Sequence, residues 1–267
     1  MSALRSPALK RDLGLVGWQI RYEQRAYWRN RGRGIFTFVF PLMFLVIFAS
    51  INKGQTVSSR GGIPYDNFFV PGILAYGVIA TTFVNMAIGT AILRDEGILK
   101  RMQGTPLPPW AYVAARIGST ILIVGGMTVL TLGLGTLAYG VDIPASTFPA
   151  LIVTLALGTA AFTSLGIGVT RFMPNAEAAP VIINLIVLPL TFISSIWFPS
   201  DDMPKALVQI AKIFPIRALA DGLQYVFDPR TAGAGFNAQD LRTLAIWTVA
   251  GVFLMLRFLR RPLGEAA

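Results

Sequence analysis

Residues 94–110, RDEGILKRMQGTPLPPW, form a block of charge between two long apolar runs. The runs, Val70–Leu93 and Ile117–Tyr139, contain no Asp, Glu, Lys or Arg. Each run is at least as long as the ~20 residues that an α-helix needs to cross a ~30 Å hydrocarbon core. The two runs therefore predict membrane spans, and the charged block is expected just outside the membrane.

A short amphipathic helix is expected within the charged block. Asp95–Gln103 consists largely of helix-forming residues that place Ile98, Leu99 and Met102 on one side. Gly104 and the prolines after it end the helix. A solvated loop with a positive-inside charge cluster is the alternative. Such a loop needs neither the apolar side nor the proline stop.

The composition of the chain is that of an integral membrane protein. Of its 267 residues, 54% are hydrophobic and 13% are charged, whereas about 25% of the residues of a typical soluble domain are charged. With helices of about 20 residues each, the chain has room for one bundle of six spans and no separate folded domain. Residues 1–34 would precede the bundle, 35–258 would form it, and 259–267 would be a tail.

Cys and His are absent. Disulfides, thiolate nucleophiles and cysteine metal sites are therefore excluded, and the sequence predicts no metal ligand and no catalytic residue. The phosphate-binding motif G-x-x-x-x-G-K-[ST] is missing as well. The expected spans hold no acidic or histidine relay of the kind that ion-coupled transporters use. A transporter of this composition must obtain its energy from another protein, or else it is a passive channel.

The N-terminal segment Lys10–Arg33 is basic, yet its apolar residues recur near helical spacing. The charges exclude a span, so we expect an interfacial amphipathic helix with Tyr27 and Trp28 at the level of the lipid headgroups. A basic arm that binds nucleic acid is the alternative. Lys and Arg beside a span are the usual orientation signal, however, and need no nucleic acid to explain them.

Six spans are expected: Ile35–Ile51, Val70–Leu93, Ile117–Tyr139, Phe148–Thr170, Ala178–Phe198 and Leu244–Phe258. The fourth repeats small residues at intervals of four, namely Ala156, Ala160, Ser164 and Gly168. Small residues let another helix approach closely. We therefore interpret this stripe as a packing surface rather than a substrate path.

Between the fifth and sixth spans, Pro199–Arg242 is too often charged to cross a bilayer. Lys205–Phe214 and Ile216–Phe227 each have the length of about three helical turns, and Pro215 separates them. They predict a re-entrant extracytoplasmic helical hairpin, which membrane depth allows only where protein or water covers its ends. An amphipathic surface loop is the alternative.

The distribution of Lys and Arg predicts the orientation. Given six spans, most of the 23 basic residues fall on the side that holds both termini and residues 94–110. By the positive-inside rule this side is cytoplasmic. Anionic membrane lipids attract such a surface, so the net charge of +10 requires no nucleic-acid partner.

Two segments resemble the ABC-2 type membrane subunits, the permeases of bacterial drug, antibiotic and polysaccharide exporters. Their first cytoplasmic loop reads approximately R-x-x-G-T-L-x-R-L-x-x-T-P, and it aligns here with Arg94, Glu96, Gly97, Leu99, Arg101, Thr105 and Pro106. Ile98 and Met102 stand where Thr and Leu are usual. The second segment, residues 192–223, matches at Phe198, Pro199, Pro204, Phe214 and Pro215, and Ser195 stands where the family often has Gly.

The resemblance implies one ABC-2 type transmembrane domain that docks on a partner. Two permease chains, expected to be identical copies, would bind two cytoplasmic ATPase chains in a bacterial inner membrane. ATP and Mg would be bound by the ATPase, so this chain would hold no cofactor and would not be an enzyme. The segment from Arg94 to Thr105 would be the coupling helix on the ATPase. The residues assigned to coupling are Arg94, Asp95, Glu96, Gly97, Leu99, Lys100, Arg101, Met102, Thr105 and Pro106.

The resemblance also implies a substrate path and an outer gate. Cavity walls would come from the second and fifth spans, at Phe83, Asn85, Met86, Asn184 and Phe192. The extracytoplasmic gate would include Phe198, Pro199, Phe214 and Pro215. The expected substrate is a hydrophobic small molecule (a drug or an antibiotic) or a lipid, moved outward by alternating access. A polysaccharide or glycolipid exporter, a passive channel and a membrane scaffold are the alternatives.

Overall fold

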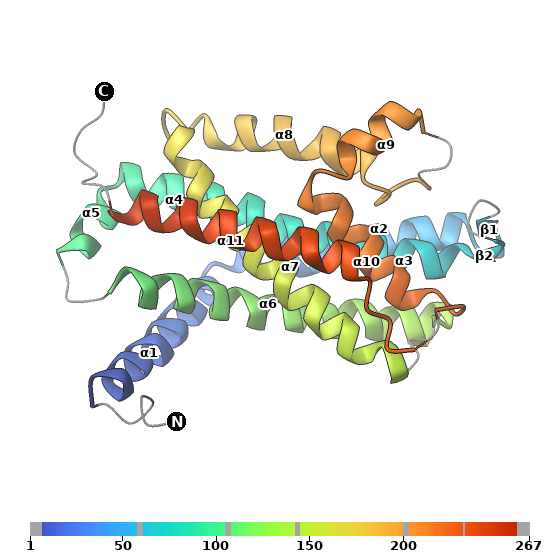
Figure 1. The fold of residues 1–267 in the computed structure, drawn as a ribbon, viewed down its shortest axis with the longest axis horizontal. Coiled ribbons are helices and arrows are strands. Elements are labelled where there is room, and N and C mark those ends of the chain that lie inside the picture. The colour runs from blue at the N-terminus through green and yellow to red at the C-terminus, as the bar shows by residue number, and fades with distance from the viewer. Residues whose placement is uncertain are drawn as a thin grey trace.

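The structure is a computed structural model, and it describes residues 7–57, 61–104, 108–141, 145–199, 203–231 and 233–260. Most of these residues are helical, and most of the longer helices run roughly along one axis (Figure 1). In this part of the chain, four helical segments are long and apolar enough to cross a membrane: Tyr65–Asp95, Pro109–Tyr139, Ala145–Phe172 and Ala238–Leu259. Thr37–Ile51 and Ala179–Ile193 are apolar but shorter. The expected helical membrane architecture is thus confirmed, with four long segments and two short ones where six spans were expected.

The first two helices, α1 (Pro7–Arg29) and α2 (Arg31–Ile51), meet at Asn30. α1 leaves the bundle at an angle and packs on α6 (Pro109–Tyr139) (Figure 1). There, Nη1 of Arg116 lies 2.7 Å from the Glu23 carboxylate, and both side chains are largely buried. The opposite face of α1 is exposed and carries Trp18, Arg21, Tyr22, Arg25 and Arg29.

The centre of the bundle is the segment from α3 to α4. After β1 (Thr56–Val57) pairs with β2 (Ile63–Pro64), α3 (Tyr65–Ile79) enters the core. π-Helical turns at Ala80–Val84 lead into α4 (Asn85–Asp95), so the whole segment is continuous. Nearly all of α3 beyond its first turn is buried, because its residues are apolar on every side.

Helices α7 (Phe148–Val169) and α11 (Ala238–Arg260) pack along most of their length. Short 3-10 turns flank α7 at Ala145–Thr147 and Thr170–Phe172. Small residues make the approach close, since a Cβ atom on Gly168 would lie 2.9 Å from the Leu254 Cβ. Ser164 lies at the same seam, opposite Gly251. The interpretation of Ser164 and Gly168 as packing positions is confirmed.

Helix α8 (Ala179–Ile193) is shorter than the expected fifth span, which was predicted to reach Phe198. Ser195 has a φ of 57°, in the left-handed region that glycine adopts without steric cost. The chain then turns inward, and a Cβ atom on Gly72 of α3 would lie 2.5 Å from the carbonyl oxygen of Ile196. A buried connection therefore replaces the last turn of the expected span, and the φ of Ser195 explains why glycine suits this position.

The predicted helical pair is present as α9 (Lys205–Ala211) and α10 (Pro215–Phe227). α10 is buried almost throughout and packs on α3, α7 and α11. Its Arg217, which is 6% exposed, forms an ion pair of 2.9 Å with Asp221 one turn later. α9 lies mostly exposed at the surface. The two helices are thus unequal, because α10 belongs to the core.

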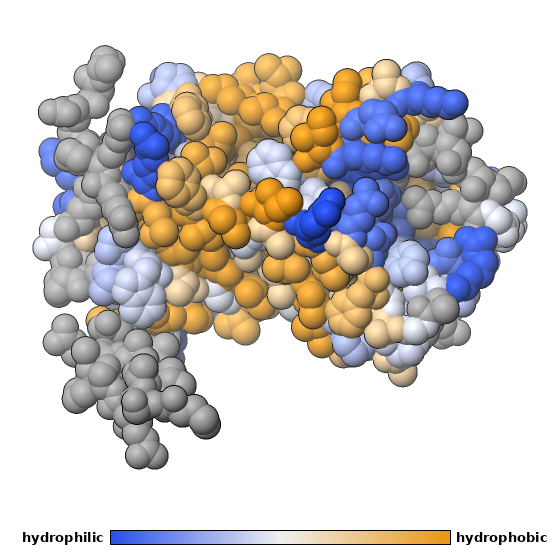
Figure 2. Space-filling model, in the orientation of Figure 1, coloured by the Kyte–Doolittle hydropathy of each residue, from blue (hydrophilic) through white to orange (hydrophobic). Residues whose placement is uncertain are grey.

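The surface divides along the bundle axis. Figure 2 shows hydrophobic side chains over the middle of the visible face, with hydrophilic ones gathered at its upper left and in its right half. α5 (Ile98–Gln103), the start of α1 and the end of α11 lie at one end, and the β1–β2 hairpin lies at the other (Figure 1). We call these the α5 end and the hairpin end.

Candidate functional site

The candidate site is the corner at which α4 turns into α5. α4 ends at Asp95, and Glu96 and Gly97 form the turn. Gly97 has a φ of 69°, which favours glycine, and its N–H donates to the Arg94 carbonyl at 3.0 Å. The expected helix Asp95–Gln103 is therefore split. Asp95 closes α4, and the following helix starts at Ile98 because the left-handed glycine separates the two.

One face of α5 is anchored in the bundle. Leu99 is 2% exposed, and Met102 packs beside it. Around them lies a small apolar cluster drawn from α4, α6, α7 and α11: Met86, Tyr112, Val113, Ile167, Met255 and Phe258. The apolar side of the predicted amphipathic helix is thus part of a cluster to which four other helices contribute. A displacement of α5 would disturb the packing of this cluster.

The other face of α5 is exposed and charged. Glu96, Lys100 and Arg101 are all exposed. The Nη2 atom of Arg101 donates to the backbone carbonyl of Glu96 at 3.2 Å. Thr105 and Pro106, which were also assigned to coupling, lie outside the described residues. The exposed charges on this corner are therefore available to a partner.

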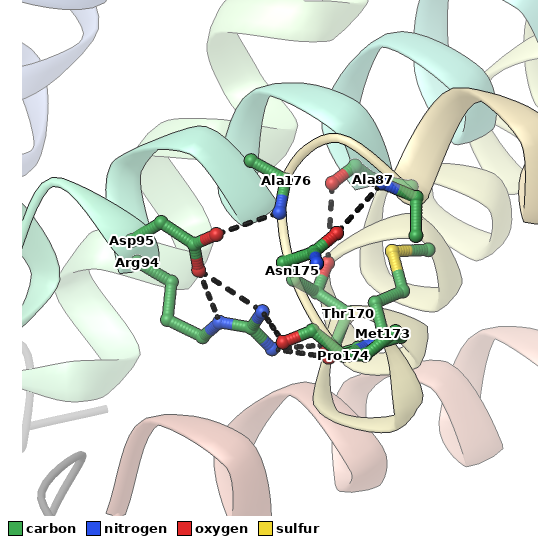
Figure 3. A network of polar contacts seen from close by, with 9 residues as sticks. Ala87, Arg94, Asp95, Thr170, Met173, Pro174, Asn175 and Ala176 are labelled. Carbon is green, nitrogen blue, oxygen red and sulfur yellow. Dashed lines mark hydrogen bonds and ion pairs between the residues drawn. The ribbon is translucent and has the colours of Figure 1, made fainter.

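Arg94 is held inside the chain. Its Nη1 atom donates to the carbonyl oxygens of Thr170 at 2.9 Å and Met173 at 2.8 Å, and its Nη2 atom to that of Pro174 at 3.3 Å (Figure 3). These carbonyls follow the C-terminal end of α7, where a cation is favourable. Arg94 therefore caps α7 from a neighbouring helix.

Asp95 holds the next part of the same loop. Its Oδ2 atom accepts the backbone N–H of Ala176 at 2.6 Å, while Oδ1 accepts from Nε of Arg94 at 3.1 Å (Figure 3). Ala176 lies just before α8, where a carboxylate complements the positive end of the helix dipole. The hydroxyl of Thr170 also donates to the Ala87 carbonyl at 3.3 Å. We call these contacts of Arg94 and Asp95 with residues 170–176 the loop clamp.

The loop clamp changes the interpretation of the coupling residues. Arg94 and Asp95 were assigned to contacts with a partner, but both are engaged with the α7–α8 loop. Contact of Arg94 and Asp95 with a partner as well stays a prediction, as it does for the exposed Glu96, Lys100 and Arg101. Sequence reasoning missed the loop residues, because backbone acceptors carry no side-chain signal. Asn175, which accepts from the Ala178 N–H at 2.8 Å, is a helix-start signal in this loop.

The five residues assigned to a substrate path fall into two groups. The backbone of Phe83 and the side chain of Met86 lie against Gly166 of α7, inside the chain, and Asn85 is half-buried in the same segment. Asn184 and Phe192 lie on the exposed face of α8. The chain by itself does not bring the five side chains to one cavity.

The residues assigned to the gate lie at or near the buried connection and α10. Phe198 is 54% exposed and stacks on Phe192 with ring centroids 6.4 Å apart. Pro215 is buried, and Phe214 stacks on Trp247 of α11 at 6.5 Å. Pro199 is half-buried. Sequence reasoning missed Gln224, whose amide donates to the Ser195 carbonyl at 2.6 Å and ties α10 to the end of α8.

Comparison with known proteins identifies the family. The family profile described as ABC-2 type transporter matches residues 15–227. The inner membrane transport permease YhhJ of Escherichia coli (strain K12) is 27% identical over 207 residues, or 73% of this chain and 53% of YhhJ. The chain thus spans about half the length of that relative. The permease YadH of the same strain is 20% identical over 69% of this chain and 71% of its own. Nodulation protein J of Rhizobium leguminosarum bv. trifolii is 28% identical over 84% of each chain.

The profile covers the helices from the middle of α1 to the end of α10, including the α4–α5 corner and the loop clamp. The named permeases among the relatives are inner membrane proteins, in agreement with the apolar helices of this chain. On this match over most of its length, the chain belongs to the ABC-2 type transporter family.

Proposed function

We propose that this transport permease is the membrane subunit of an exporter whose energy comes from a separate cytoplasmic ATPase. The chain crosses the membrane six times, with α2 and α8 as its two short spans. The α5 end and both termini face the cytoplasm. Each complex contains two permease chains and two ATPase chains, and ATP and Mg are bound by the ATPase.

The observation that carries this proposal is the shape of the α4–α5 corner. A six-residue helix is anchored through Leu99 and Met102, and its Lys100 and Arg101 are exposed, as is Glu96 in the turn before it. Charged groups of this kind select a partner and fix its register. Since the sequence has no phosphate-binding loop of its own, an ATPase is the partner that a driven transporter needs.

The exposed face of α8 supports a second permease chain. Asn184 is exposed there among Val181, Leu185 and Leu188, which are 70%, 73% and 46% exposed. An amide in contact with lipid tails is unfavourable, whereas Asn side chains form hydrogen bonds between membrane helices. A second copy of this chain, or a cavity between two copies, would cover Asn184.

The substrate is proposed to be a hydrophobic small molecule, such as a drug or an antibiotic, or a lipid. The side chains near Asn184 and Phe192 are mainly apolar, and they suit an apolar substrate with a few polar groups. A polysaccharide or glycolipid is the second candidate, and it would be expected to need more aromatic stacking positions along its path.

Photo-cross-linking tests the docking surface. Benzoylphenylalanine at Lys100 should cross-link to the ATPase chain in the assembled complex. The same probe at Arg230, which is exposed beyond α10, should not. Cross-linking from Arg230 but not from Lys100 would overturn the proposed orientation.

A further inference from the structure

Hydrogen bonds attach helix α8 to the bundle at its two ends. At the α5 end, the loop clamp holds the loop that precedes it through Arg94 and Asp95. At the other end, Gln224 of α10 donates to the Ser195 carbonyl at 2.6 Å. Ile196 beside it is fully buried against Gly72 of α3. Both attachments use backbone groups of the connections rather than side chains of α8.

The middle of α8 touches the rest of the chain along a single stripe. Ile183, Val187 and Thr191 are buried at intervals of four, while the residues between them are mostly exposed. A helix with one contact stripe has fewer packed neighbours to resist its displacement than a helix that is buried on every side. The attachments at its two ends therefore help to set where α8 lies.

The clamp also lies directly beside the proposed coupling helix. Arg94 and Asp95 are the last two residues of α4, and only Glu96 and Gly97 separate them from α5. A movement of α5 reaches Arg94 and Asp95 through two residues of chain. Through the hydrogen bonds of these two side chains, it also reaches residues 170–176, which lead into α8.

We propose that Arg94 and Asp95 are positioning residues that make α8 move with α5, and so pass the movement of the docked ATPase to the hairpin end through the Gln224–Ser195 contact. The inference rests on the proposed function, because it needs an ATPase to move α5. It assigns these two side chains to contact with the α7–α8 loop rather than to contact with the ATPase.

A cysteine pair tests the inference directly, because the chain contains no native cysteine. Asp95→Cys removes the bond to the Ala176 N–H, and Asp95→Cys with Ala176→Cys allows a covalent bridge to replace it, formed by oxidation or by a short thiosulfonate cross-linker. Permease and ATPase are reconstituted in vesicles, and transport per ATP hydrolysed is measured before and after bridging.

The single variant should assemble with the ATPase but lose about fivefold or more in transport per ATP, the scale of a typical coupling between sites. Bridging the pair should restore most of that ratio, and reduction should remove it again. A side chain that contacts the ATPase would not be rescued by a bridge to Ala176. If the bridged pair does not recover transport per ATP in vesicles where the wild type transports, the inference is overturned and the proposed function still stands.

A second measurement needs no ATPase. Amide hydrogen exchange in residues 171–178 of the purified permease should accelerate by about fivefold or more in Asp95→Ala, since a protecting charge-assisted hydrogen bond is lost. The matched control is Asp228→Ala, which breaks the Arg230–Asp228 ion pair of 2.8 Å at the other end and should leave this loop unchanged. Equal exchange in Asp95→Ala and wild type would show that no clamp exists. If Asp95→Ala accelerates exchange but the wild type shows no ATP-driven transport, the proposed function is refuted instead.

Discussion

Replacing Glu96 with alanine tests whether the α4–α5 corner meets a partner. The Glu96 side chain is exposed at the C-terminal end of α4, two residues before α5 begins. A carboxylate is disfavoured at a helix C-terminus and favoured before an N-terminus, each by ~0.3–1 kcal/mol. The two effects oppose each other here. Glu96→Ala should therefore change the free energy of unfolding of the permease by less than ~1 kcal/mol.

The effect of Glu96→Ala on the affinity between the permease and the ATPase should be larger. Truncating one member of a buried charge pair at an interface costs about 2–5 kcal/mol, partly because the other charge is left buried and unpaired. The lower limit corresponds to a rise in Kd of about 30-fold. Glu96→Gln keeps the shape and some hydrogen bonding, so it should weaken binding less. Glu177→Ala removes an exposed carboxylate at the same end and serves as the control.

The assay measures the Kd between the ATPase and permease variants in lipid nanodiscs, together with the melting temperature, ATP turnover and transport. Unchanged affinity and transport in Glu96→Ala would refute the assignment of this carboxylate to docking. A strongly destabilised permease would show that the role of Glu96 is structural, in conflict with its exposed position.

Three further changes follow from the packing. Leu99→Ala should destabilise the α5 end by about 2–5 kcal/mol, as is usual for a truncated buried leucine. Lys100→Ala changes an exposed side chain and should not. Equal melting temperatures for the two variants would contradict the burial of Leu99. Ser195→Gly should raise the free energy of unfolding by up to ~1 kcal/mol by relieving the left-handed φ, and Ser195→Val should lower it. The reverse order of melting temperatures would show that residue 195 does not have a left-handed φ. Cysteines placed at Phe214 and Leu219 should react slowly with an impermeant thiol reagent added from outside, and one placed at Arg230 quickly, because Leu219 is 0% exposed and Arg230 is exposed; equally rapid labelling of all three would favour a surface loop over a buried α10.

The charge-free runs predicted the long helices well, and what they did not show is tertiary. α6 extends beyond the third expected span, Ile117–Tyr139, back to Pro109, and Arg116 in this extension pairs with Glu23 of α1 at 2.7 Å. No local pattern reveals that partner, which lies 93 residues away. The end of α8 was missed for a similar reason. Ser195 turns the chain because Gly72 of α3 leaves room for Ile196.

The candidate site was predicted in part. Hydrophobic spacing indicated the buried side of α5, where Leu99 and Met102 lie against the bundle. It gave no sign that Gly97 would divide the helix, because glycine within a helical pattern is often tolerated. The roles of Arg94 and Asp95 could not be predicted from the sequence either. Their partners are backbone groups of residues 170–176, and every sequence has such groups.

The central claim is that this chain moves its substrate only with a separate ATPase. The most direct measurement compares ATP-driven uptake of a fluorescent hydrophobic dye into inverted vesicles that hold the purified permease alone or the permease with its ATPase. The account predicts no uptake and no ATP hydrolysis by the permease alone, and both activities when the ATPase is present. ATP-driven uptake by the permease alone would contradict it.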